Sequence, residues 1–272
     1  MSGMPAGPIR VLYLIDTLEI GGAEKSLLDI LPRLEGVEPV LCHLYPGPAL
    51  RRAYERAGIA VVSLDLPGRY AFLRAIRAVR GVVRDHRPDL IHSTLLRSDL
   101  VARAVGTLAG IPVVGSFVSE GRSRRSEGRC DRLLAVKGFA VHLLDRLTAR
   151  RVAAFVANSG TAKASNCRAL GVPEAKVRVL YRGRDASVFH PAGEGSRRAG
   201  DGAQPPVSGV PVLTCVGRLR EAKGHGDVIR AMPRVLARFP GAQLVIRGEG
   251  PARAGLEALV DELRLRLSVA LP

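Results

Sequence analysis

Short apolar runs rich in β-branched residues and leucine alternate with longer segments of helical periodicity along most of the chain. This alternation is typical of βαβ units, in which helices join parallel strands and cover the sheet, and it predicts an α/β fold with a doubly wound, Rossmann-like sheet. The expected strands of the first 190 residues are Arg10–Ile15, Pro39–Leu44, Ala60–Leu64, Leu90–His92, Pro112–Phe117, Ala154–Asn158 and Val177–Leu180. The expected helices are Ala23–Leu34, Ala49–Ala57, Tyr70–Asp85, Ser98–Ala109, Gly138–Arg150 and Thr161–Leu170.

The texture changes after residue 190. Residues 191–210 (PAGEGSRRAGDGAQPPVSGV) have no periodic apolar positions and are typical of a flexible linker. A second pattern of two strands and two helices follows, at Pro211–Val216, Gly226–Arg238, Ala242–Ile246 and Pro251–Leu267. Two parallel strands leave both sheet edges open. We therefore predict an N-terminal domain at 1–190, a linker, and an incomplete second domain at 211–272.

The composition favours anionic partners. The chain has 41 basic and 25 acidic residues and a formal net charge of +16, which suits nucleic acid, an acidic membrane surface or a phosphorylated substrate. Scattered surface arginine explains the same charge equally well. Aromatic residues make up only 4% of the chain, without tryptophan, which argues against a base-stacking nucleic-acid platform.

The four cysteines are far apart and form no CxxC pair, a pattern typical of a reduced cytosol without a zinc site. Val11–Ile15 is too short for a signal-peptide core, and no run reaches the length of a membrane span. We expect a cytoplasmic protein. The helix near 70–87 has one apolar face and many arginines, which suits an ordinary domain helix or a peripheral contact with an anionic membrane at the inner face of the cell membrane.

Gly21 and Gly22 follow the first strand and open a helix. Such a pair can form a tight turn, with Glu24 stabilising the helix start through its dipole. It can also clear space for a phosphate to approach the N–H groups of the helix. Both interpretations stay open from these residues alone.

A second loop after a strand carries two cations, Arg218 and Lys223, behind Gly217. Two cations at the carboxyl end of a strand can neutralise a diphosphate or can simply be solvated. Gly248 and Gly250 follow the next strand, without completing GxGxxG. The chain has no P-loop and no Asp-x-Asp pair, which argues against a metal-bridged diphosphate.

Read in order, several stretches resemble the retaining glycosyltransferases of family 4, whose members have two Rossmann-like domains in the GT-B fold. The stretches are Gly21-Gly22-Ala23-Glu24, Arg87–His92, Gly171–Val177 with Gly183-Arg184-Asp185 and Phe189-His190-Pro191, and Gly217–Gly224 with Gly248–Pro251. This resemblance spans nearly the whole chain. It implies transfer of a sugar from a nucleotide-sugar donor to an acceptor hydroxyl with retained configuration, without metal or cofactor, in the synthesis of cell-envelope polysaccharide, glycolipid or a related glycoconjugate.

The resemblance also implies residue roles. Donor binding would fall to glycines on both sides of the domain interface, and Arg218 and Lys223 would hold the nucleotide diphosphate and stabilise it as it leaves. This role suits the chemistry, because negative charge develops on the departing diphosphate. His92 is a candidate catalytic residue, and the acceptor would be a glycan or a lipid-linked molecule. The donor-binding glycines are Gly21, Gly22, Gly217, Gly248 and Gly250.

The chain departs from the family pattern at three places. Thr94 stands in the expected cleft, where the family often has a second histidine near the sugar and the acceptor. The hinge segment, usually an aromatic residue or proline followed by Asn-Gly-Val-Asp, introduces Arg182 and Arg184 beside Asp185 in the expected cleft. The family's paired glutamates would lie beyond residue 272, and we interpret the equal spacing of Glu249 and Glu257 as a coincidence. A truncated second domain is therefore expected.

Two alternatives stay open. The chain could be a catalytically incomplete fragment that acts as a binding module, or a basic nucleic-acid-binding protein. Since no nucleic-acid-binding motif is recognised, nucleic acid is not the expected partner.

Overall fold

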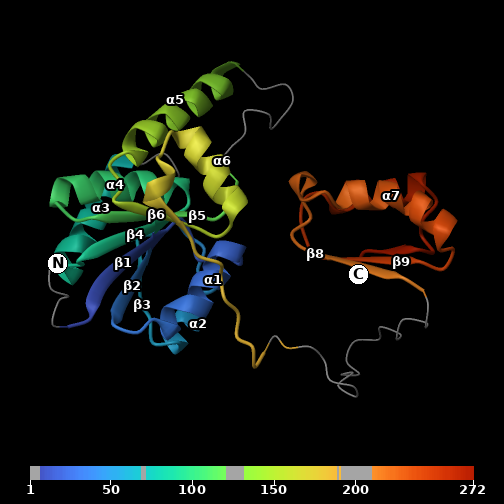
Figure 1. Ribbon diagram of the computed structural model, residues 1–272, viewed down its shortest axis with the longest axis horizontal. Coiled ribbons are helices and arrows are strands. Elements are labelled where there is room, and N and C mark those ends of the chain that lie inside the picture. Colours follow the sequence, from blue (N-terminus) through green and yellow to red (C-terminus); the bar gives the residue numbers. More distant parts are fainter. Residues whose placement is uncertain (1–6, 69–71, 121–131, 189, 191–209) are drawn as a thin grey trace. The chain divides into compact units, whose positions relative to one another are not determined.

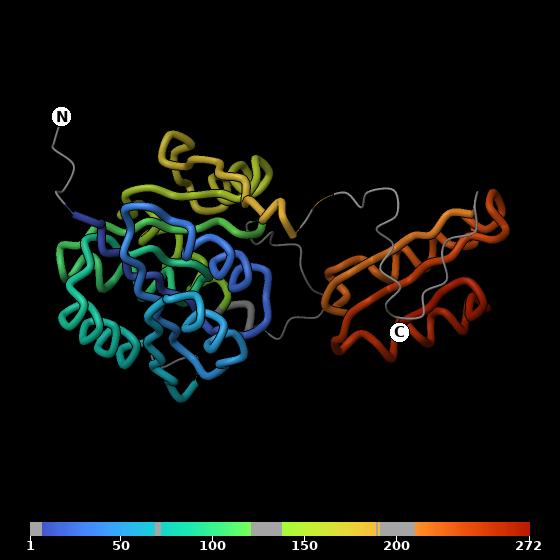
Figure 2. Tube along the Cα trace, turned by 90° about the horizontal axis from the view of Figure 1, so that it is seen from below, coloured from blue at the N-terminus to red at the C-terminus, as the bar shows by residue number. Residues whose placement is uncertain are grey.

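The computed structural model describes residues 7–68, 72–120, 132–188, 190 and 210–272, and the side chains of 132–137 are not described. The chain divides into two compact units, Met1–Pro191 and Ala192–Pro272 (Figures 1 and 2). Of the predicted linker, only Val210 is described.

The first unit contains a sheet of parallel strands in the order β3-β2-β1-β4-β5-β6-β7 (Figure 1). The expected strands of this region are confirmed, each with a start within two residues of the expected one. Their bounds are β1 Ile9–Ile15, β2 Val37–His43, β3 Ala60–Ser63, β4 Leu90–Thr94, β5 Val113–Phe117, β6 Ala154–Ala157 and β7 Val177–Val179.

The helices of the first unit also follow the expected order. Only α5 differs widely, because it begins before the expected Gly138, in a stretch rich in leucine and alanine, which are good helix formers. The bounds are α1 Gly22–Ile30, α2 Arg51–Arg56, α3 Phe72–His86, α4 Leu96–Ala109, α5 Arg132–Ala149 and α6 Gly160–Leu170.

Strand β1 lies at the centre of the first unit and is buried on both faces. Leu12 and Leu14 point to one face and pack with residues of α3 and α4. Tyr13 and Ile15 point to the other face and pack with α1 and with Tyr54 of α2. A strand buried on both sides needs an almost continuous apolar sequence, which explains the run VLYLI.

The second unit is a small parallel sheet in the order β10-β9-β8. Its elements are β8 Val212–Val216, α7 His225–Arg238, β9 Gln243–Arg247, α8 Arg253–Glu262 and β10 Val269–Ala270. Both helices pack on the same face of this sheet (Figure 1). On the other face, Val212 and Val216 of β8 are exposed.

Two expectations for the second unit were wrong. The last helix ends at Glu262 instead of Leu267, and a third strand, β10, pairs with β9. The chain leaves the helix through Arg264, which has a φ of 56°. This turn buries Leu265 in the core and lets the next residues extend along β9, which stabilises the sheet more than a further helical turn in solvent would.

Within the described residues, no helix combines the length and the apolar character that crossing a bilayer requires.

The exit from α8 gives a test of this unit's core. Leu265→Ala should lower the free energy of unfolding of the second unit by about 2 to 5 kcal/mol, because it leaves a cavity beside β10. Leu267→Ala is the matched control, since Leu267 is 93% exposed, and should change stability by less than about 0.5 kcal/mol. Urea unfolding of the full chain measures both. Equal effects of the two substitutions would contradict the assigned packing.

Candidate functional site

The candidate site of the first unit lies where the strand order reverses. Strand β1 pairs with β2 on one side and with β4 on the other, so the chain connections leave in opposite directions from this point. In open parallel sheets, ligands bind outside the carboxyl ends of the strands at such a switch point. Gly21 and Gly22 follow β1 at the start of α1, and Thr94 ends β4, with His92 two residues before it. The tertiary structure therefore gathers these predicted residues at one edge.

The two glycines of this loop have different structural reasons. Gly21 is the N-cap of α1, and a Cβ there would overlap the carboxylate of Glu24, which is buried against it. Gly22 faces open space, since a Cβ there would meet no atom within 4 Å beyond its chain neighbours and its own helix. A side chain at position 21 would therefore displace the buried carboxylate of Glu24, whereas packing gives no reason for glycine at position 22.

The segment after β7 lies along α1. Arg182 Nη1 donates a hydrogen bond of 3.2 Å to the carbonyl of Gly22, and Arg184 Nη2 donates one of 3.2 Å to Ser26 Oγ. Gly22 and Ser26 are four residues apart, so the two partners lie on one face of α1.

Two ion pairs add to the contacts between α1 and the segment after β7. Arg184 Nη1 lies 3.5 Å from Asp29 Oδ2, and Arg33 Nη2 donates a bond of 2.6 Å to Asp185 Oδ2. Of the residues predicted for the cleft, Arg182 is therefore brought to the glycine loop, whereas Arg184 contacts residues further along α1 and Asp185 contacts Arg33 just after it. Their predicted role in a ligand cleft stays a prediction.

His92 is held as a neutral imidazole. Its Nε2 is 2.7 Å from Ser116 Oγ, and its ring centroid is 5.1 Å from that of Tyr13. Burial, followed by the positive charge of Arg182, lowers the pKa of His92 to about 4. Near neutral pH the ring can accept or donate a hydrogen bond, but it carries no additional proton. Thr94, at the end of the same strand, is buried and pairs with Ile15 and Ser116 in the sheet.

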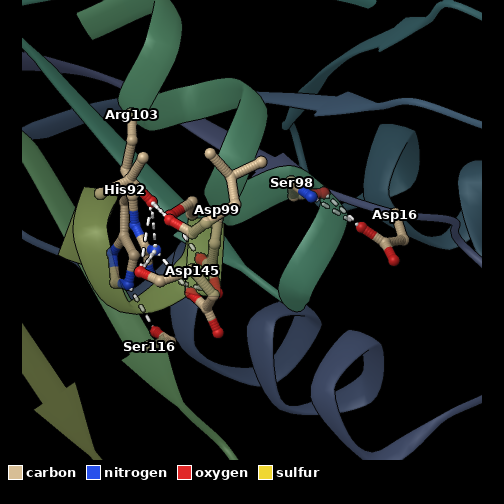
Figure 3. Close-up of polar contacts among 10 residues, drawn as sticks. Asp16, His92, Ser98, Asp99, Arg103, Ser116 and Asp145 are labelled. Atoms are coloured by element: carbon tan, nitrogen blue, oxygen red, sulfur yellow. Dashed lines mark hydrogen bonds and ion pairs between the residues drawn. The ribbon is translucent and has the colours of Figure 1, made fainter. Parts of the chain in front are cut away.

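Sequence reasoning missed a polar cluster around the buried Arg103 (Figure 3). The buried Arg103 of α4 donates to Asp145 of α5 at 2.6 Å, and Asp99 accepts from Ser93 Oγ at 2.6 Å. Burial raises the pKa of Asp99 to about 7, although Arg103 opposes this shift. Arg103 and Asp145 are 42 residues apart, and no local pattern could have paired them.

A second missed residue is Asp16, which directly follows β1. Its Oδ1 accepts bonds from the backbone N–H of Ser98 at 2.9 Å and from Ser98 Oγ at 2.7 Å. Ser98 lies in the first turn of α4, so a carboxylate meets the positive end of that helix, as Figure 3 shows. The position of an aspartate at a strand end was the available sequence signal.

In the second unit the predicted residues lie at the carboxyl ends of β8 and β9. Gly217 follows β8, and a Cβ there would come no closer than 3.8 Å to another residue's atoms, the nearest being Nε2 of His225. Arg218 and Lys223 are exposed on the same connection to α7. Their convergence on one ligand stays a prediction.

Gly248 and Gly250, in contrast, are required by close backbone approach. A Cβ on Gly248, whose φ is 152°, would overlap the carbonyl of Gly217, and one on Gly250 would overlap that of Leu219. Bonds from Gly217 N to Arg247 O and from Leu219 N to Glu249 O tie these two loops together. Packing alone therefore explains glycine at positions 248 and 250, and the predicted contact of these residues with the sugar donor stays a prediction.

His225 was also missed. It opens α7 and is 6% exposed, and its Nε2 has no hydrogen-bond partner among the described residues.

The carboxylates of Glu249 and Glu257 both bind Arg253, at 2.9 Å and 3.2 Å, and this local pairing explains why both glutamates are present. Among the residues that the structure describes, no three His, Cys, Asp or Glu side chains gather as metal ligands would.

The neutral state of His92 gives a pH test. The unfolded chain takes up a proton on this ring near pH 6.5, whereas the folded chain does so near pH 4, so acidification through this window favours unfolding. His92→Gln should remove that loss. Asp99 acts in the opposite direction, since its raised pKa adds stability that is lost as the pH rises from about 4 to about 7.

The measurement is therefore the difference between variant and wild type. Urea unfolding of both chains at about pH 4.5 and about pH 7.5 should show that acidification costs the wild type more. An identical pH dependence in the two chains would contradict a neutral, buried His92.

Comparisons with known proteins agree with this architecture. Residues 21–183 match the family described as glycosyl transferase 4-like domain, and residues 201–271 match the family described as glycosyl transferases group 1. The chain is 29% identical over 194 residues to an uncharacterized glycosyltransferase of Methanocaldococcus jannaschii, covering 70% of this chain and 47% of that protein. It is 27% identical over 184 residues to the glycogen synthase of Mycobacterium tuberculosis, covering 68% of this chain and 40% of that protein.

Solved structures share the fold. Anabaena Alr3699/HepE, solved in complex with UDP, has a TM-score of 0.72 at 18% identity, covering 97% of this chain and 68% of that one. Sucrose-phosphate synthase from Thermosynechococcus elongatus has a TM-score of 0.72 at 16% identity, covering 97% and 70%. The chain spans less than half the length of the two curated relatives above. Because residues 21–183 cover more than half of the chain, it belongs to the glycosyl transferase 4-like family.

Proposed function

We propose that this chain forms part of a retaining glycosyltransferase of family 4, which moves a sugar from a nucleotide-sugar donor to an acceptor hydroxyl. The observation that carries the proposal is the loop after β8. It combines a glycine that packing does not require, Gly217, with two exposed cations, Arg218 and Lys223, at the carboxyl end of a parallel strand. Such a loop suits a diphosphate, and the family matches on both units support the same reading.

The proposed chemistry needs no metal and no cofactor. As the sugar leaves, negative charge builds up on the nucleotide diphosphate. Arg218 and Lys223 neutralise it, and preorganised cations lower the barrier because they need no rearrangement during the reaction. The relative solved with UDP supports a uridine nucleotide as the first donor to test.

The glycine loop of the first unit serves the donor or the acceptor in this proposal. Gly22 leaves its backbone open, and Arg182 places a half-buried guanidinium beside it. His92, held neutral, offers a hydrogen bond to a sugar hydroxyl. The acceptor is a glycan or a lipid-linked molecule of cell-envelope, glycolipid or related synthesis, met by a cytoplasmic protein at the inner face of the membrane.

Nucleotide binding without transfer is the second candidate. It rests on the same loop after β8, because Arg218 and Lys223 account for binding of a diphosphate whether or not a sugar is transferred. In that case the 272 residues act as a binding module of a longer or a partnered enzyme. Calorimetry with UDP and GDP tests binding, and a transfer assay with a panel of UDP- and GDP-sugars tests turnover. Binding without turnover would support the second candidate. A chain that shows neither nucleotide binding nor sugar transfer would contradict both candidates.

Substituting the two cations tests the loop directly. Arg218→Gln and Lys223→Gln should each weaken binding of the preferred nucleotide about 10- to 100-fold, because each removes a charge-assisted bond of about 1.5 to 3 kcal/mol. Arg238→Gln is the matched control, since it removes the same charge from an exposed position at the far end of α7. Equal losses in all three variants would show a general charge effect and contradict a specific site.

Gly22→Ala tests whether the glycine pair only forms a turn or also lets a phosphate approach the backbone. Alanine at this helix position should raise the free energy of unfolding by up to about 1 kcal/mol, since nothing obstructs its methyl group. The same methyl group should weaken nucleotide binding if a phosphate approaches the backbone there. Gly21→Ala, which clashes with Glu24, should instead lower stability. A more stable Gly22→Ala chain with unchanged affinity would mean that the pair serves only the turn.

A further inference from the structure

Helix α5 presents a row of large apolar side chains to solvent. Phe139, Leu143 and Leu147 are spaced four residues apart, so they lie on one stripe of the helix. Phe139 and Leu147 are more than half exposed, and Leu144 is exposed beside them. Among the described residues, no other helix exposes so many large apolar side chains.

The opposite side of α5 anchors the helix to the first unit. Asp145 accepts the bond from buried Arg103, Thr148 Oγ1 lies 3.1 Å from the same guanidinium, and Ala149 is completely buried. These contacts fix the rotation of the helix about its axis. The packing of α5 on the first unit therefore determines which side of the helix faces solvent.

The charges around this stripe are positive. Arg146, Arg150 and Arg151 are exposed within or just after the helix. Asp145 is the only acidic residue between 138 and 151, and it is turned toward Arg103. Single exposed leucines are common on proteins, but a contiguous apolar stripe marks an interaction surface.

A second basic helix lies in the same layer. Helices α3 and α5 both contact α4, and they lie on the same side of the sheet (Figure 1). Arg74, Arg77, Arg80, Arg84 and Arg87 of the α3 region are all exposed. At the start of α3, Leu73 is 81% exposed. This layer thus combines apolar side chains with many cations.

We propose that α5 docks on an anionic lipid bilayer, lying parallel to the surface with its apolar stripe in the headgroup region and its arginines on lipid phosphates. An apolar stripe flanked by arginine is the physical signature of such interfacial helices. A second copy of this chain fits less well, because each copy carries a net charge of +16 and two basic faces repel each other. The proposal does not depend on the proposed sugar transfer.

Co-sedimentation of the full chain with vesicles tests this surface. The wild type should sediment with vesicles of phosphatidylcholine and phosphatidylglycerol, much less with phosphatidylcholine alone, and less at high salt, which screens the charge attraction. Leu143→Ser/Leu147→Ser should weaken binding to the anionic vesicles on the order of tenfold, because it removes the centre of the stripe. Leu180→Ser/Leu267→Ser is the matched control at exposed leucines outside this helical layer and should bind as the wild type does.

Three results would overturn the proposal. The first is a wild type that does not sediment with anionic vesicles, and the second is equal sedimentation of the two double variants. The third is a concentration-dependent dimer in gel filtration that is lost only in Leu143→Ser/Leu147→Ser, which would assign the stripe to a second copy. Nucleotide affinity measured on the same variants should be unchanged, so failure of the membrane surface and failure of the nucleotide site remain distinguishable.

Discussion

The parallel pairing of β1 between β2 and β4 is the constraint on which the rest of the first unit depends. Because all strands of this sheet run in one direction, their carboxyl ends meet at one edge. Burial on both faces excludes polar side chains from the strand itself, so they gather where the strands end. Asp16 and Gly22, which follow β1, and Thr94, which ends β4, come from distant parts of the chain and lie at this edge for this reason.

The glycine loop is held in place by contacts from neighbouring residues as well as by its own backbone conformation. Glu24 covers Gly21 from within α1, and the segment after β7 returns to the same helix through Arg182 and Arg184. Of the two arginines that depart from the family pattern, Arg182 contacts the glycine loop that matches it, and Arg184 contacts the helix that this loop opens. A departure and a match that are about 160 residues apart in sequence belong to one structural feature.

The fold could be predicted largely because its signals are local. Apolar runs gave the strands, and helical periodicity gave the helices between them. The last strand, Val269–Ala270, was missed because two residues carry too little periodicity to be distinguished from a helix end. The exposed stripe of α5 was missed for a related reason, since an apolar helix sequence does not say which side packs on the sheet.

The sequence by itself determined the order of the elements, the glycine loops at strand ends and the positions of the candidate cations, because each of these follows from neighbouring residues. Only the tertiary structure decided that Gly248 and Gly250 are required by close backbone contacts, whereas Gly217 is not. It also decided that Arg103 pairs with Asp145 and that His92 is neutral. Steric contact, ion pairing and burial depend on residues far apart in the chain, and only the folded sheet and its helices bring them together.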